Sequence, residues 1–468
     1  MTLEFPPDRL AAWTGGRWTR LPALPTTGFS IDSRTIRPGQ MFVAVRTARR
    51  DGHGSAAAAA AAGASAALVS APVPGLDLAQ LVVPDTVAAF HAIAGAHRRG
   101  FPGTVIGVSG SAGKTSTKNL LAVLLGGADV LSTKGNLNNH LGVPLTLTRL
   151  DPRLHLHAVV EAGIGGPGEM APLAAMMAPD IAIITLVAPA HLSGLGSLEG
   201  VAREKAGLAA AVRDGGLALF PASCLDFASF RGLGARAVVV VRDPGGVSPG
   251  RGRTAAHFTV EPGFESTRLT LAYKGPPTAF HLRSASEGMA QNAALALCAG
   301  LELGIAPEVL QARLTAWHPA ALRGELQRCG DKLYYLDCYN ANPASMADAL
   351  EAFGHVAPAG EPRLYVIGGM EELGAESARY HEALGRRIRL RPQDQLFVIG
   401  EHAPEVRAGA LDGGAGPEQV RVVESLRSVS EALAGFCGAV FVKGSRRHEL
   451  EKILEGAVGI RLPVESHA

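Results

Sequence analysis

The segment Thr104-Val105-Ile106-Gly107-Val108-Ser109 is an apolar strand that leads directly into the turn Gly110-Ser111-Ala112-Gly113-Lys114-Thr115. Glycines in such a turn let the backbone approach an anion closely, so that successive N–H groups point at it. A helix that begins at about Lys114 adds favourable partial charge at its N-terminus. The strand, the turn and the helix together predict a phosphate-binding loop.

Two side chains at the end of this turn suit a nucleoside triphosphate. Lys114 can neutralise β- and γ-phosphate oxygens, and the Thr115 hydroxyl can coordinate Mg²⁺. Val108 stands where the longer pattern G-x-x-x-x-G-K-[ST] has its first glycine, so the loop has the shorter form G-x-x-G-K-T. The alternative is a glycine turn with a solvated lysine, and the flanking strand and helix argue against it. We therefore expect ATP and Mg²⁺ as ligands.

On both sides of this loop, short apolar runs alternate with helical patterns. Such alternation predicts βαβ units and mostly parallel sheets, and 468 residues are too many for one core. We therefore predict an α/β fold of three domains, with a central mostly parallel sheet of the phosphate-loop type between two further α/β domains. The expected strands are 41–45, 66–69, 104–109, 158–160, 181–184, 333–336, 363–368, 395–399 and 439–442.

The predicted domains are 1–102, 103–320 and 321–468. The first boundary lies within residues 98–103, which combine Arg, Gly and Pro as a linker does, and the second follows Trp317-His318-Pro319. The last domain alternates like a Rossmann fold but has no G-x-G-x-x-G opening, so we do not expect dinucleotide binding there.

The composition excludes some classes of partner. With 44 basic and 42 acidic residues, the formal net charge of +2 gives no reason to expect nucleic acid or an anionic membrane. The sequence shows no signal peptide and no apolar run of the ~20 residues that a membrane helix needs. The five cysteines are scattered without C-x-x-C spacing, as free thiols of a reducing compartment are. We expect a cytoplasmic protein without membrane insertion.

Further segments carry a family resemblance. In chain order they are Ile31-Asp32-Ser33-Arg34, Asp51-Gly52-His53, Gly135-Asn136-Leu137-Asn138-Asn139-His140, Glu161-Ala162-Gly163, Ala190-His191-Leu192, Ala202-Arg203-Glu204-Lys205, Asp337-Cys338-Tyr339-Asn340-Ala341-Asn342-Pro343, Gly369-Met370-Glu371-Glu372-Leu373-Gly374 and Val442-Lys443-Gly444-Ser445-Arg446. Together with the phosphate loop they resemble the Mur ligases, which build the peptide stem of bacterial peptidoglycan. The resemblance covers almost the whole chain.

The resemblance implies an ATP-dependent ligase that forms a C–N bond between a carboxylate and an amine by way of an acyl phosphate. The segment that begins at Asp337 is most similar to members that add D-alanyl-D-alanine to UDP-N-acetylmuramoyl-tripeptide. These two substrates are the expected partners, the UDP-muramoyl-pentapeptide of cell-wall synthesis is the expected product, and a monomer is expected. By the same resemblance, residues 1–102 hold the UDP part, 103–320 hold ATP, and 321–468 close over the nucleotide.

The resemblance also implies roles for single residues. Glu161 ends an apolar strand and matches a metal ligand, His191 matches a ligand of a second Mg²⁺, and Lys205 matches a lysine that CO₂ carbamylates into a metal-binding anion. The expected catalytic residues are Lys114, His191 and Lys205, and the expected metal ligands are Thr115, Glu161, His191 and Lys205. The expected ATP-binding residues are Gly110, Ser111, Ala112, Gly113, Lys114, Thr115, Ser116, Asn292, Arg323, Asp337 and Tyr339; those for the UDP-peptide are Ser33, Arg34, Asn138 and Asn139.

Each of these residues also has an ordinary structural reading. Glu161 and Lys205 could be solvated charges, and Ser33, Arg34, Asn138 and Asn139 could be turn-capping polar residues. Three positions depart from the family pattern. Leu186 stands where an asparagine usually follows the threonine, Gly288-Met289 stand where His-Asn usually precedes the adenine-side asparagine, and the alanine stretch at 56–62 is unusually low in complexity.

Three other functions are weighed against this one. A ligase for the third residue of the stem would carry an Asp-Asn-Pro-Arg motif, which this sequence lacks. Folylpolyglutamate synthase shares the chemistry but has no uridine-binding first domain. A catalytically silent nucleotide-binding relative is supported only by the changes at Leu186 and Gly288.

Overall fold

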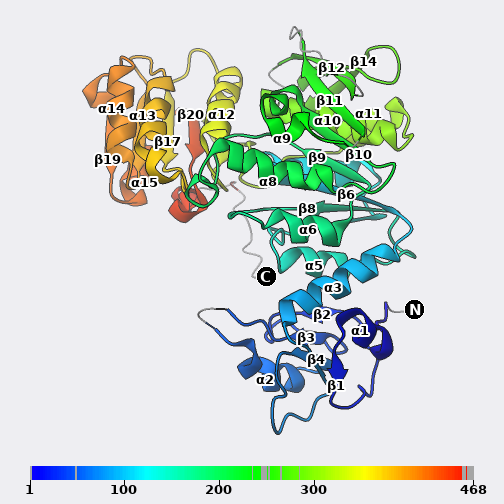
Figure 1. Ribbon diagram of the computed structural model, residues 1–468. Coiled ribbons are helices and arrows are strands. Elements are labelled where there is room, and N and C mark those ends of the chain that lie inside the picture. The colour runs from blue at the N-terminus through cyan, green and yellow to red at the C-terminus, as the bar shows by residue number, and fades with distance from the viewer. Residues whose placement is uncertain are drawn as a thin grey trace.

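Three β-sheets, each packed against helices, divide the protein into N-terminal, middle and C-terminal domains (Figure 1). The computed structural model describes residues 3–47, 50–234, 236–243, 250, 253–263, 266–283, 285–455 and 460. In Figure 1 the blue N-terminal domain lies below the cyan-to-green middle domain, and the yellow-to-red C-terminal domain lies beside the middle domain. The prediction of three α/β domains with mostly parallel sheets is confirmed.

The N-terminal sheet has the strand order β1-β5-β4-β3-β2. Only β1 runs antiparallel to its neighbour. The elements are α1 (Pro7–Thr14), β1 (Arg17–Trp18), β2 (Phe29–Ser30), β3 (Met41–Val43), the 3₁₀ turn η1 (Gly52–Ser55), α2 (Ala56–Ala61), β4 (Ala66–Val69), β5 (Gln80–Val82) and α3 (Thr86–Arg99).

The middle sheet has nine strands in the order β14-β13-β12-β11-β10-β9-β6-β8-β7. Strands β6 to β12 pair in parallel, whereas β13 pairs antiparallel to both of its neighbours. The elements are β6 (Thr104–Ser109), α4 (Lys114–Leu124), β7 (Val130–Ser132), α5 (Gly142–Leu147), β8 (His157–Glu161), α6 (Met170–Met177), β9 (Ile181–Ile184), α7 (Leu192–Leu195), α8 (Leu198–Ala210), β10 (Leu217–Pro221), η2 (Ala222–Asp226), α9 (Ala228–Arg231), β11 (Arg236–Arg242), β12 (Arg253–Glu261), β13 (Ser266–Ala272), β14 (Thr278–Arg283), α10 (Glu287–Glu302) and α11 (Pro307–Thr315).

The C-terminal sheet has the order β15-β16-β20-β17-β18-β19, in which only the β15–β16 pair is antiparallel. The elements are β15 (Glu325–Cys329), β16 (Lys332–Asp337), α12 (Pro343–Val356), β17 (Arg363–Gly368), η3 (Gly374–Glu376), α13 (Ser377–Arg387), β18 (Gln395–Ile399), α14 (Ala403–Asp412), η4 (Pro417–Gln419), β19 (Val420–Val423), α15 (Leu426–Ala434), β20 (Gly438–Lys443), η5 (Arg446–His448) and η6 (Leu450–Leu454).

Both faces of the middle sheet are covered, which explains why its central strands are apolar throughout. Ile106 and Val108 of β6 pack with α4 and α10, while Val105 packs with α6 and α8 on the other face. Since parallel strands β8, β6 and β9 are neighbours, their carboxyl ends meet at one edge of the sheet. The phosphate loop, Glu161 and Thr185 lie at this edge, where open α/β sheets bind their ligands.

The junction between the N-terminal and middle domains is buried rather than an exposed linker. Helix α3 continues to Arg99, and Phe101 lies in the core of the middle domain. The Arg98 side chain is only 1% exposed, and its guanidinium pairs with Asp180 at 2.7 Å and donates to the carbonyl of Met177 at 2.9 Å. The Arg and Pro that suggested a linker therefore belong to a packed interface.

Removing the buried charge at this junction should destabilise the protein. Arg98→Ala removes one donor from the Asp180 carboxylate, which keeps the Val105 N–H and Arg213. It also removes a donor from the carbonyls of Phe101, Met177 and Ala178, so unfolding should become easier by about 1–3 kcal/mol. Arg99→Ala, which removes the exposed neighbour on the same helix, is the matched control. Urea unfolding followed by circular dichroism measures both, and equal midpoints for the two variants would contradict this account of the junction.

Candidate active site

The phosphate loop is held in a shape that only glycines permit. Gly110 and Gly113 have φ angles of +152° and +78°, in the region that residues with side chains rarely adopt. A Cβ on Gly110 would lie 1.8 Å from Thr185 Oγ1, and one on Gly113 would lie 2.4 Å from Asn292 Nδ2. Close packing by β9 and α10 therefore fixes the loop from two sides.

Hydrogen bonds to the chain after β9 hold the loop in place. The Ser111 N–H donates to the Leu186 carbonyl at 2.8 Å, and the Ser111 hydroxyl donates to the Ala188 carbonyl at 2.8 Å. The Thr185 hydroxyl donates to the Ala112 carbonyl at 2.5 Å. Leu186 thus contributes through its backbone, which explains how the loop is anchored without the usual asparagine at that position.

Glu161 lies at the centre of a set of oxygen and amide groups. Its carboxylate accepts from the Thr115 hydroxyl at 3.0 Å and from Asn138 Nδ2 at 2.8 Å. The carboxylate is buried at 2% exposure, at the carboxyl end of β8. A hydroxyl and a carboxylate are the hard oxygen ligands that Mg²⁺ prefers. Among the described residues no three His, Cys, Asp or Glu side chains converge as a ready-made metal site.

Two lysines face this carboxylate. Lys114 Nζ donates to the Gly110 carbonyl at 2.8 Å, and Lys118 Nζ donates to the Thr133 carbonyl at 2.7 Å. Burial lowers the pKa of both ammonium groups, Glu161 opposes that shift, and the charge of Arg323 adds to it. Several positive groups therefore gather at the loop, as a polyphosphate requires.

His191 and Lys205 flank the loop. His191, at φ +55°, precedes α7, and its ring Nδ1 contacts the carboxylate of Glu372 in the C-terminal domain. Lys205 lies on α8 and is only 1% exposed. Burial lowers the pKa of Lys205 well below its usual value, and the charge of Lys114 adds to this shift. Burial also lowers the pKa of His191.

The C-terminal domain supplies the facing wall. The Arg323 guanidinium stacks over the Tyr339 ring at 4.0 Å from its centroid. Asp337 pairs with Lys443 Nζ at 2.6 Å, and burial raises the pKa of the Asp337 carboxyl although Lys443 opposes that shift. Asn342 caps α12 and donates to the Ser111 carbonyl of the phosphate loop at 3.0 Å.

These groups line one cleft of about 600 Å³ between the middle and C-terminal domains. Of the residues singled out from the sequence, the cleft brings together Ser111, Ala112, Gly113, Lys114, Thr115, Ser116, Asn138, Asn139, Glu161, His191, Asn292, Arg323, Asp337 and Tyr339. Gly110 and Lys205 are not among the residues that line it, and Ser33 and Arg34 lie in the N-terminal domain.

Ser33 and Arg34 follow β2 in an exposed turn. The Arg34 guanidinium pairs with Asp32 at 2.6 Å and is largely exposed. The hydrogen bonds from Arg34 lower the pKa of Asp32, and the charge of Arg50 also contributes. Two arginines therefore flank this turn.

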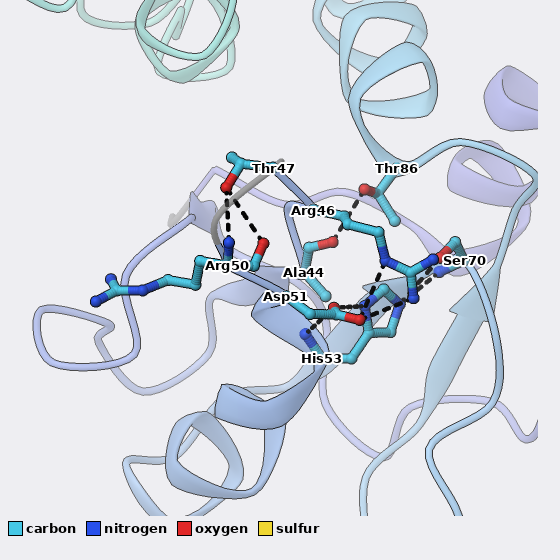
Figure 2. A network of polar contacts seen from close by, with 8 residues as sticks. All are labelled: Ala44, Arg46, Thr47, Arg50, Asp51, His53, Ser70 and Thr86. Atoms are coloured by element: carbon cyan, nitrogen blue, oxygen red, sulfur yellow. Dashed lines mark hydrogen bonds and ion pairs between the residues drawn. The ribbon is translucent and has the colours of Figure 1, made fainter.

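The nearby Asp-Gly-His segment forms a polar network that closes a loop (Figure 2). Asp51 pairs with Arg46 at 2.8 Å and with His53 Nδ1 at 2.6 Å, while His53 Nε2 accepts from the Ser70 N–H at 2.9 Å. The His53 N–H and these side chains lower the pKa of Asp51 to about 2. A Cβ on Gly52 would lie 2.7 Å from the Val45 carbonyl oxygen, so residue 52 has no room for a side chain. Asp51, Gly52 and His53 therefore each have a structural role in this loop.

Gly288 has a specific neighbour in this chain. Its N–H donates to Asp348 Oδ1 of α12 at 2.7 Å, and a Cβ there would lie 2.8 Å from Asp348 Oδ2. Burial raises the pKa of Asp348, and hydrogen bonds from Ser286 and Gly288 oppose that shift. The absence of a side chain at residue 288 thus lets the C-terminal domain reach the start of α10.

Sequence analysis missed Lys118, Asp348, Glu372 and Lys443 as parts of the site. Glu372 and Lys443 stand in the segments that carry the family resemblance, which is a signal that could have identified them. Lys118 follows Lys114 by one helical turn, which also places it on the same helix face. For Asp348 no signal is apparent.

None of the described helices is long and apolar enough to cross a membrane.

Family models match three parts of the chain. They are the Mur ligase family catalytic domain over residues 25–98, the Mur ligase middle domain over 108–300, and the Mur ligase glutamate ligase domain over 323–446. The chain is 31% identical to the UDP-N-acetylmuramoyl-tripeptide--D-alanyl-D-alanine ligase of Escherichia coli K12, over 91% of this chain and 92% of the relative.

Solved structures show the same arrangement. A crystal structure of MurF from Acinetobacter baumannii superposes with a TM-score of 0.85 at 27% identity, covering 97% of this chain and 98% of that one. MurF ligase from Thermotoga maritima in complex with ADP has a TM-score of 0.77 at 26% identity, covering 92% and 96%.

The loop's dependence on glycine can be tested directly. Gly113→Ala should weaken ATP binding at least about tenfold, which corresponds to about 1.4 kcal/mol of binding free energy. The added methyl group would displace Asn292 and strain the backbone. Gly127→Ala is the control, since Gly127 also has positive φ (+68°) but nothing within 4 Å of the added Cβ. Calorimetric titration with an ATP analogue separates the two, and equal affinities would refute the crowding argument.

Proposed function

This chain belongs to the Mur ligase family, and we propose that it joins D-alanyl-D-alanine to UDP-N-acetylmuramoyl-tripeptide by way of an acyl phosphate. The observation that carries the proposal is the likeness to a ligase of that name over 91% of the chain, together with one cleft that holds the phosphate loop, Glu161 and His191. The product would be the UDP-muramoyl-pentapeptide of peptidoglycan synthesis.

In the first step, a carboxylate oxygen of the tripeptide attacks the γ-phosphorus of ATP. The bond from the γ-phosphorus to the β,γ-bridging oxygen breaks, which gives an acyl phosphate and ADP. Both reactants are anions, so the step needs positive charge around the transferred group. Lys114 and Arg323 supply that charge from opposite walls of the cleft, and the backbone N–H groups of the loop hold the phosphates.

Thr115 and Glu161 would hold one Mg²⁺. Their oxygens already meet at 3.0 Å, and the donor set is of the hard type that this ion prefers. His191 and a carbamylated Lys205 would hold a second ion. When bound, the ions neutralise negative charge on the phosphate oxygens.

Lys205 is suited to carbamylation because it is buried with a lowered pKa. An amine attacks CO₂ only in its unprotonated form, and burial favours that form. The carbamate carries a negative charge, which would be stabilised by the neighbouring Lys114. A buried lysine beside another lysine is otherwise costly, so the modification also relieves a repulsion.

In the second step, the free amine of D-alanyl-D-alanine attacks the carbonyl carbon of the acyl phosphate. The tetrahedral intermediate collapses, the carbon–oxygen bond to phosphate breaks, and the amine loses one proton. Asn292, Arg323, Asp337 and Tyr339 would hold ATP as the C-terminal domain closes. Closure excludes water, which would otherwise hydrolyse the acyl phosphate.

The UDP end of the substrate would lie at Ser33 and Arg34, where Arg50 adds a second positive charge. Asn138 and Asn139 would orient the muramoyl-peptide. Asn139 Oδ1 already accepts from the Leu141 and Gly142 N–H groups, which leaves its amide nitrogen for the substrate.

We further propose that residues 1–102, 103–320 and 321–468 act as the UDP-binding, ATP-binding and closing domains. We also propose a monomer as the active form. The proposed use of ATP as a substrate supports a cytoplasmic location.

The proposed reaction predicts a strict requirement for both substrates. Purified protein with Mg²⁺ and ATP should release phosphate only when UDP-muramoyl-tripeptide and D-alanyl-D-alanine are both present. Lys114→Ala should lower kcat at least about 100-fold, because one charged partner of the transferred group is lost. Lys452→Ala removes an exposed lysine and should leave the rate unchanged. Phosphate release that does not depend on both substrates would refute the proposed function. A catalytically silent nucleotide-binding relative would release no phosphate.

Carbamylation of Lys205 predicts a carbon signal that depends on this side chain. With ¹³C-bicarbonate, the native enzyme should show a carbamate resonance in its NMR spectrum. Lys205→Arg keeps the positive charge but cannot form the carbamate under these conditions, so it should lose both the resonance and the ligase activity. A resonance that survives this substitution would place the modification elsewhere.

A further inference from the structure

We propose that Glu372 is a positioning residue that fixes the ring of His191 when the C-terminal domain docks on the middle domain. In this view the site for the second metal ion is complete only in the closed enzyme. The inference rests on the proposed function, because that function gives His191 its metal-binding role.

Residue 372 touches the His191 loop with both its side chain and its backbone. The Glu372 carboxylate contacts His191 Nδ1, and the Glu372 carbonyl accepts from the Ser193 N–H at 3.1 Å. The two residues are 181 positions apart and belong to different domains. Two contacts at one residue define both the place and the orientation of the docked loop.

The backbones at this contact are shaped for close approach. His191 and Glu372 have φ angles of +55° and +63°, which residues with side chains rarely adopt. Gly374 also has positive φ, and a Cβ on it would lie 3.4 Å from the Ser193 Cα atom. Such unfavourable conformations persist where the surroundings fix them, and they gather at functional sites.

The contact determines which nitrogen of His191 is available. An ionised carboxylate can only accept a hydrogen bond, so in the neutral ring the proton is on Nδ1 and the lone pair is on Nε2. His191 lines the cleft, which makes Nε2 the atom left for a cation there. Metal-binding histidines usually hold their other N–H against a carboxylate or a carbonyl, and loss of that partner typically weakens metal binding 10- to 100-fold.

A purely structural role predicts a different outcome. The side chains of His191 and Glu372 are 28% and 57% exposed, and ion pairs this exposed contribute little to folding. Removing the Glu372 carboxylate should therefore leave the thermal unfolding midpoint nearly unchanged. A positioning role instead changes the affinity of one metal site.

The neighbouring Glu371 offers a matched control. It stands in the same loop, but its carboxylate faces Arg447 at 3.5 Å and His448 at 3.7 Å within the C-terminal domain. Replacing it removes the same charge from almost the same place without touching His191.

The experiment measures Mn²⁺ binding by electron paramagnetic resonance, using the full chain saturated with a non-hydrolysable ATP analogue. We expect two bound ions in the native enzyme. Glu372→Ala should weaken the second ion at least tenfold and leave the first unchanged, whereas Glu371→Ala should bind both normally. Glu372→Gln should recover most of the affinity, because its amide oxygen still accepts from Nδ1–H.

Several results would overturn the proposal. They are a single ion in the native enzyme, normal binding of both ions by Glu372→Ala, an equal loss in Glu371→Ala, or a Glu372→Gln variant as weak as Glu372→Ala. Phosphate release by the native enzyme is measured in parallel. If native turnover requires both substrates but Glu372→Ala binds ions normally, this inference fails while the proposed function stands.

Discussion

The backbone of the phosphate loop has no room for side chains at Gly110 and Gly113, and the rest of the site is built around that constraint. Thr185 packs against Gly110, Asn292 packs against Gly113, and the Asn342 side chain donates a hydrogen bond to the carbonyl of Ser111. These three residues come from the end of β9, from α10 and from the start of α12. The phosphate loop is therefore in contact with the edge of the middle sheet, with helix α10 and with the C-terminal domain.

Much of this arrangement could be predicted from sequence because it depends on local patterns. The strands at 104–109, 181–184, 363–368 and 395–399 lie where short apolar runs predict them. The loop follows from the order of strand, glycines and helix, and the edge position of Glu161 follows from parallel pairing of β6 with β8. Roles for Asn292, Arg323 and Tyr339 needed the family resemblance, since spacing does not bring them to the loop.

Other features could not be predicted, since they depend on contacts between distant segments. Arg98 was expected in a linker because charge usually means exposure, but here Asp180 and three carbonyls compensate its burial. The pairing of His191 with Glu372 depends on how two domains dock. At Gly288 a change from the family pattern suggested a weakened nucleotide site. In the structure that glycine provides the space through which Asp348 reaches α10, so the change has a consequence for domain contact.

The two domain junctions differ in kind. Ala94 of α3 belongs to the hydrophobic core of the middle domain, whereas the clusters of the C-terminal domain draw on residues 322–460 alone. The C-terminal domain meets the middle domain through hydrogen bonds such as those of Asn342 and Asp348, which can be exchanged for water at small net cost. Opening the cleft therefore exposes no core, while separating the N-terminal domain would. In the proposed reaction, the two ends of the nucleotide-linked substrate are held by the pair of domains that does not separate. In that reaction the protein would set a fixed distance between the uridine end and the reacting carboxylate, and a substrate would be selected by its length as well as by its chemical groups.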